Sequence, residues 1–106
     1  MFKTEEIKAA KSMKSAVSMM RQNLQDDQWA KRALIAIYNN QTAEEQSAGE
    51  TKEDNGIGFT GVDAGILTSF AEFYLANKFL SPKQMAILKN KIGKYSGQLI
   101  KIANLR

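Results

Sequence analysis

The stretch "LSPKQMAILKNKIGKYSGQLIKI", residues 80–102, carries the clearest helical signal in the chain. Ser81 has the residue type of an N-cap, Pro82 follows at the first helical position, and Gln84 has the spacing of a capping box. Apolar residues then recur at alternating spacings of three and four, at Met85, Leu88, Ile92, Tyr95, Leu99 and Ile102. This pattern predicts a helix over 82–103.

Two glycines interrupt this last helix, Gly93 and Gly97. Each costs about 1 kcal/mol relative to alanine in a helix interior. Three interpretations follow: the helix is broken near 93–97, it bends there, or the glycines let another helix approach closely.

The same apolar spacing predicts the other helices. The stripes place them at 4–25, 28–39 and 63–78. Asp26-Asp27 offers a cap for the second of these, and Asp63 is the expected N-cap of the third. The chain holds one proline and little period-two alternation, so we expect one all-α domain over its 106 residues, a small helical bundle of about four helices.

The segment 42–61 is expected to be a central acidic, glycine-rich loop. It contains Gly49, Gly56, Gly58 and Gly61, with Asn55-Gly56 as a turn signal. Thr42 and Glu45 have capping-box spacing, so a short helix is a further interpretation of its start.

Charge is distributed unevenly along the chain, whose formal net charge is +4. Between residues 42 and 63 there are six acids and one base, a local −5. From residue 78 to the end there are seven bases and no acid. Such asymmetry indicates an electrostatic partner.

The chain lacks residues that several kinds of catalysis and metal binding usually require. The chain has no cysteine and no histidine, so it has no thiol nucleophile and lacks the commonest general base and metal ligand. The carboxylates show no convergent pair for acid-base work. We therefore expect a protein that is not an enzyme and has no cofactor or metal.

Gly56, Gly58 and Gly61 match the G-x-G-x-x-G spacing of dinucleotide-binding loops. Such a loop follows a buried strand, whereas the residues before this one read "AEEQSAGETKED", polar and acidic. The glycines are better explained by a tight turn that needs positive φ before a helix.

Membrane insertion and export find no support in the sequence. The longest apolar run is "ALIAIY", residues 33–38, and charges punctuate the N-terminus. We expect a cytoplasmic protein, in the host cell cytoplasm if a phage encodes it.

Residues 70–95 have the outline of a helix-turn-helix, two amphipathic helices joined by a short turn. Any helical hairpin in a bundle looks similar, so packing remains the alternative interpretation. The candidate nucleic-acid-binding residues are the lysines of the last helix, with an N-terminal row beside them: Lys83, Lys89, Lys91, Lys94, Lys101, Lys8, Lys11 and Lys14. The last helix lacks arginine, the commonest base-reading residue, which favours phosphate contact over sequence readout.

The half from Asn55 onward resembles a small helical module of phage and other mobile-element proteins. The matching pattern is Asn-Gly-x-Gly-Phe, an Asp-started helix, Leu-Ser-x-Lys-Gln and Lys-Tyr-x-x-Gln-Leu. Here these residues are Asn55, Gly56, Gly58, Phe59, Asp63, Leu80, Ser81, Lys83, Gln84, Lys94, Tyr95, Gln98 and Leu99. The resemblance implies a mobile-element setting close to nucleic-acid machinery and carries over no catalytic role.

Two functional hypotheses follow. The first is a non-enzymatic phage or mobile-element protein that contacts DNA or RNA through its basic C-terminal helix. The second is a phage-encoded inhibitor, of the anti-CRISPR type, that binds a host nucleic-acid-handling or defence protein.

Overall fold

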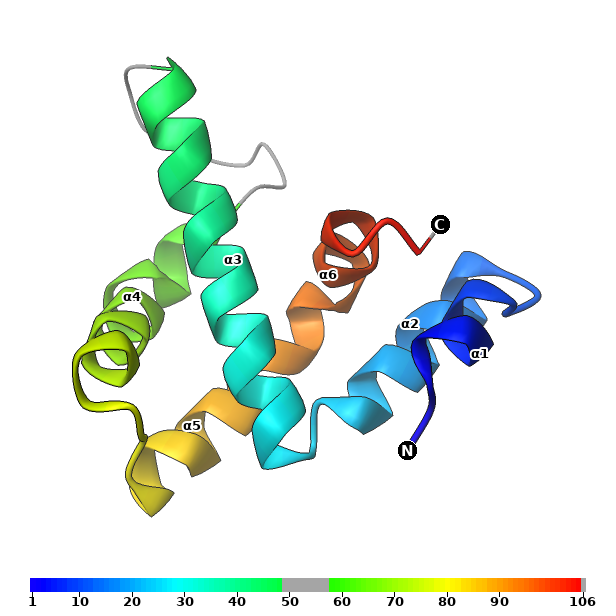
Figure 1. Cartoon of the computed structure of the whole chain (residues 1–106), viewed down its shortest axis with the longest axis horizontal. Coiled ribbons are helices and arrows are strands. Elements are labelled where there is room, and N and C mark those ends of the chain that lie inside the picture. The colour runs from blue at the N-terminus through cyan, green and yellow to red at the C-terminus, as the bar shows by residue number, and fades with distance from the viewer. Residues whose placement is uncertain (49–57, 106) are drawn as a thin grey trace.

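The computed structural model describes the backbone of residues 1–48 and 58–105 and the side chains of residues 1–41 and 58–105. The described residues form helices and no strand, which confirms the predicted small all-α bundle (Figure 1). In chain order the elements are α1 (Thr4–Lys8), α2 (Met13–Asn23), α3 (Asp27–Ala48), α4 (Gly61–Asn77), α5 (Pro82–Ile92), the 3₁₀ turn η1 (Gly93–Tyr95) and α6 (Ser96–Ile102).

The predicted single helix over 4–25 is wrong, because the chain turns between α1 and α2. Ser12 starts a new helix: its hydroxyl accepts a hydrogen bond from the amide of Ser15 at 3.2 Å, as an N-cap does. Met13, the first residue of α2, is 38% exposed.

The second predicted helix, 28–39, is too short. Asp26 caps it by accepting from the amides of Gln28 and Trp29, and α3 continues to Ala48. No glycine or proline occurs between Asp27 and Ala48, so nothing in the local sequence ends the helix earlier. The predicted loop over 42–61 is therefore helical in its first part, while residues 49–57 lie outside the described residues.

Helix α4 begins at Gly61, two residues before the predicted start at 63. Thr60 occupies the N-cap position with extended backbone, and Asp63 is the third residue of the helix instead of its cap. At its other end, Lys78 takes a left-handed conformation with φ of 68° and provides the turn into α5 without a glycine.

The last predicted helix, 82–103, is divided. The capping box at its start is confirmed, since the Ser81 hydroxyl accepts from the Gln84 amide and the Gln84 side chain accepts from the Ser81 amide. The backbone tightens to a 3₁₀ turn at Gly93–Tyr95 before α6, so the chain is broken within the predicted 93–97 interval.

Helix α3 runs through the middle of the bundle (Figure 1). It packs against α4, α5 and α6, while α2 packs against α1 and α6. The wholly buried apolar side chains of the core include Ile7, Leu24, Leu34, Ile37, Leu67, Leu88, Ile92 and Ile100. Among the described helices, none has the length and apolar character needed to cross a membrane.

Candidate functional site

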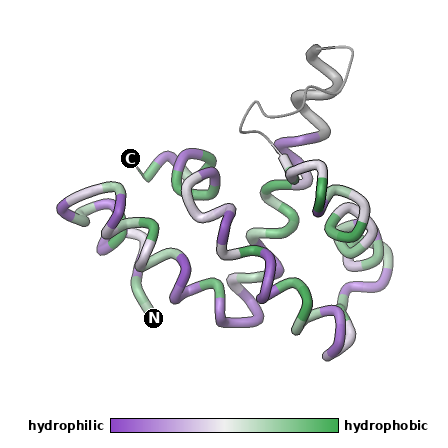
Figure 2. Tube along the Cα trace, turned by 180° about the vertical axis from the view of Figure 1, so that it is seen from behind, coloured by the Kyte–Doolittle hydropathy of each residue, from purple (hydrophilic) through white to green (hydrophobic). Residues whose placement is uncertain are grey.

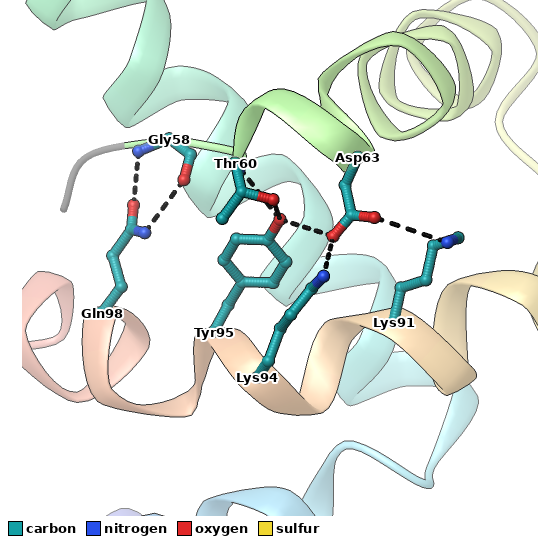
Figure 3. A network of polar contacts seen from close by, with 7 residues as sticks. All are labelled: Gly58, Thr60, Asp63, Lys91, Lys94, Tyr95 and Gln98. Carbon is teal, nitrogen blue, oxygen red and sulfur yellow. Dashed lines mark hydrogen bonds and ion pairs between the residues drawn. The ribbon is translucent and has the colours of Figure 1, made fainter. Parts of the chain in front are cut away.

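A buried carboxylate lies where α4 meets the end of α5. The side chain of Asp63 is 1% exposed and holds three partners (Figure 3). Its Oδ2 accepts from the Tyr95 hydroxyl at 2.8 Å and pairs with Lys94 Nζ at 2.5 Å, and its Oδ1 pairs with Lys91 Nζ at 3.4 Å. Two cations therefore face one buried anion.

The partners of Asp63 keep it ionised. Burial raises the pKa of its carboxyl group, but the hydrogen bonds from Lys94 and Tyr95 and the attraction of Lys94 outweigh burial and lower the pKa overall. The same hydrogen bond to Asp63 raises the pKa of Lys94. Burial also raises the pKa of the Tyr95 hydroxyl, which stays a proton donor at neutral pH.

Beside Asp63, the segment Gly58 to Thr60 is held by side chains from three other elements. The Gly58 amide donates to Gln98 Oε1 at 2.7 Å, and Gln98 Nε2 donates back to the Gly58 carbonyl at 3.0 Å (Figure 3). The next amide, of Phe59, donates to Gln41 Oε1 at 2.9 Å. The Thr60 amide donates to the Tyr95 hydroxyl at 3.0 Å.

These contacts explain Gly58, the middle glycine of the G-x-G-x-x-G spacing. Gly58 has φ of +84°, and a Cβ there would lie 2.6–2.8 Å from atoms of Gln41. Gly61 begins α4, whereas Gly56 lies outside the described residues. A phosphate cradle offers free amides, but the amides of residues 58–60 already donate to protein side chains.

The two distant parts of the module-like pattern thus meet in space. Gly58, Phe59 and Asp63 come from one part, and Lys94, Tyr95 and Gln98 from the other. The rings of Phe59 and Tyr95 also pack edge to face, 5.9 Å apart. The described residues of the pattern at this junction have a structural role, joining the start of α4 to η1 and α6.

An open basic cleft lies between α2 and the end of α5, next to this network. Its volume is about 580 Å³, and it is lined by Arg21, Gln25, Ala86, Lys89, Asn90, Gly93 and Lys94. The lining contains three cations and two carboxamides and no carboxylate. Such a surface can hold an anion with several oxygens, because cations supply charge and amides supply further donors.

Two of the eight predicted lysines line the cleft, and both already have a partner. Lys89 forms an ion pair with Asp27 at 2.6 Å, and Lys94 pairs with Asp63. Lys91 reaches the same Asp63 from α5 and is 31% exposed. These lysines therefore combine a structural contact with partial exposure.

The other predicted lysines do not join them in one patch. Lys83 is exposed at the start of α5, and Lys101 is exposed on α6. Lys8, Lys11 and Lys14 are exposed at the turn between α1 and α2, at the opposite edge of the molecule from α5 (Figure 1). The break between α1 and α2 separates this row from the last helix.

Sequence reasoning missed Arg21, which faces Lys89 and Lys94 across the cleft. Arg21 lies on α2, and only tertiary packing brings α2 beside η1. One signal was available: Arg21 and Gln25 are four residues apart, so they share a polar side of α2 and its following turn.

Comparison with protein-family models, curated proteins and solved structures finds no match for this chain. Within the described ranges, no group of three or more acidic side chains is arranged to hold a metal ion.

Proposed function

We propose that this chain is a non-enzymatic protein that contacts the phosphate backbone of nucleic acid through the cleft between α2 and α5. The observation that carries the proposal is the lining of that cleft, in which Arg21, Lys89 and Lys94 converge with no carboxylate among them. The phage and mobile-element setting suggested by the sequence pattern is part of the same proposal.

The net charge around the cleft sets how strongly binding depends on salt. Three cations line the cleft, Arg21, Lys89 and Lys94, and Lys91 adds a fourth as a partner of Asp63. Asp27 and Asp63 neutralise part of this charge. Four positive and two negative charges leave a local +2. Contact with about two phosphates predicts a slope of log K against log salt of about −1.8 for duplex DNA and about −1.4 for single strands.

The arginine across the cleft gives the cleanest test of the proposal. Charge reversal at Lys91 or Lys94 would also remove a partner of the buried Asp63, so lost binding could reflect lost folding. Arg21 is exposed and lines the cleft, whereas Arg32 is also exposed, on α3, and lies outside it. Arg21→Glu and Arg32→Glu therefore change the net charge by the same amount, and only the first changes the cleft.

The experiment titrates the wild type and both variants into fluorescently labelled single- and double-stranded DNA and RNA, at low and physiological salt. We expect Arg21→Glu to weaken binding tenfold or more and Arg32→Glu to weaken it less than threefold. Equal weakening by both would show that only net charge matters and would remove the cleft from the proposal. Circular dichroism of each variant checks that the helices remain.

Absence of binding to every nucleic acid at low salt would reject the proposal. The alternative function, a phage-encoded inhibitor that binds a host nucleic-acid-handling or defence protein, would then be the one to test. A protein inhibitor of that kind would keep its activity in the Arg21→Glu variant unless the cleft itself is the protein contact.

A further inference from the structure

Helix α4 has an exposed apolar side. Val62 is 89% exposed and Ile66 is 37% exposed. Phe79, just beyond the helix, is 55% exposed and packs edge to face on Phe73 with ring centres 5.6 Å apart. Residues 62, 66, 69 and 73 follow spacings of four, three and four, so they lie on one side of α4.

The opposite side of the same helix enters the core through Leu67, Phe70 and Ala71. Apart from a few polar positions, α4 is therefore apolar on both sides, and Figure 2 shows it mainly in green and white. A helix that is hydrophobic all round is normally covered all round. The exposed side of α4 is therefore a candidate contact surface.

Charge identifies the partner. No lysine or arginine occurs between Gly61 and Asn77. Of the two acids of α4, Asp63 is held in the buried network, whereas Glu72 is exposed and lies near the Tyr38 hydroxyl at 3.4 Å. Two copies of a chain with net charge +4 repel each other least where neither presents a cation, and within α4 itself this side meets that condition, with Lys78 at the C-cap beyond it.

We propose that two copies of this chain associate through α4, antiparallel about a two-fold axis between Ile66 and Ser69. This arrangement places Val62 of one copy opposite Phe73 of the other, and Ile66 opposite Ser69. Large side chains then face smaller ones, and both copies use the same patch, as an isologous dimer requires. Near the axis, Gly65 has no atom within 4 Å of the position a Cβ would take, which leaves room for the second helix.

The size of the surface makes the dimer weak. Helix α4 has 17 residues and is about 25 Å long, and a contact strip about 10 Å wide covers roughly 250 Å² in projection. The accessible area of such a strip exceeds its projected area, but even twice the projected area is below the roughly 800 Å² that each partner buries in a standard interface. The dimer should therefore be weak and reversible.

Sedimentation equilibrium from about 5 µM to about 1 mM tests the proposal. We expect the mean mass to rise from 11.8 kDa toward twice that value with concentration, and to rise further at higher salt because screening reduces repulsion. Val62→Glu places a carboxylate on the contact surface, while an acid in the first turn suits the helix dipole and favours folding. Thr4→Glu is the matched control, because Thr4 is an exposed first-turn residue of α1.

The dimer should disappear in Val62→Glu and persist in Thr4→Glu. A second test uses the absence of natural cysteine: Ser69→Cys should form dimers with a short bis-maleimide, and Ser18→Cys, exposed on α2, should not. A wild type that stays monomeric at every concentration would overturn the proposal, as would a dimer that Val62→Glu leaves unchanged. The proposal does not depend on the basic cleft, whose binding weakens with salt.

Discussion

Replacing Asp63 with asparagine should destabilise the protein by about 2 kcal/mol at pH 7. The side chain keeps its shape, so core packing is unchanged. The hydrogen bond from Tyr95, 2.8 Å long, loses its charge assistance and about half its strength. The new amide NH₂ group faces ammonium groups and finds no acceptor there, which costs about 1–3 kcal/mol. Loss of the ion pairs with Lys91 and Lys94 adds little to this cost, because these side chains are 31% and 49% exposed and can turn to solvent.

The pH dependence separates this cause from a packing defect. The pKa of Asp63 is lowered in the folded state, so its charge stabilises the fold above the unfolded pKa of about 3.9. This stability is lost as the pH falls through the lower, folded pKa. The difference in unfolding free energy between wild type and Asp63→Asn should therefore be full at pH 7 and shrink in acid, where the protonated wild type also carries a neutral side chain.

Urea unfolding, followed by the fluorescence of the single tryptophan, measures both effects. Trp29 is half-buried against the core, so its emission reports on packing. A loss of about 2 kcal/mol lowers the urea midpoint by roughly 1–2 M for a domain of this size. The control is Asp27→Asn, since Asp27 is 59% exposed in its ion pair and should cost less than about 1 kcal/mol. A change below about 0.5 kcal/mol for Asp63→Asn, or a difference that stays constant from pH 7 to pH 3, would refute the reasoning.

Two further substitutions test the backbone contacts. Gly58→Ala should cost about 2–3 kcal/mol in the same urea assay, because φ is +84° and the new Cβ displaces Gln41 from the Phe59 amide. Gly61→Ala is the matched control, because no atom lies within 4 Å of the position that its Cβ would take. It should be neutral or stabilising by up to about 1 kcal/mol. Asn23→Ala removes the buried carboxamide that bonds both the amide and the carbonyl of Phe2, at 2.8 and 2.7 Å, and should cost about 1–3 kcal/mol. Hydrogen exchange should then rise in α1 and stay unchanged in α4, and equal increases in both would contradict a local role.

The helix starts were predictable where the cap is local. Ser81 and Gln84 form the capping box that their spacing indicates, because both partners lie within one turn. Asp63 shows the limit of this reasoning. It has the right residue type for an N-cap, but a carboxylate can serve as a cap or as a buried ion-pair partner, and only the lysines and the tyrosine of the distant η1 region decide between the two.

The sequence predicted that the candidate site is basic, but it did not predict which basic residues meet there. Lys89 and Lys94 were identified from the basic C-terminal half, but their facing partner Arg21 belongs to α2. The row formed by Lys8, Lys11 and Lys14 extends the same surface only if residues 4–25 form one helix, and the structure divides them into α1 and α2.

The sequence alone determined the helical class, the main apolar stripes and the uneven charge, because these depend on residue type and on spacing within a few turns. The tertiary structure decided which residues meet. Gln98 holds the backbone of Gly58 across 40 positions, and Asp63 collects cations from about 30 residues away. Such contacts depend on how the helices cross, and a short-range pattern carries no information about that crossing.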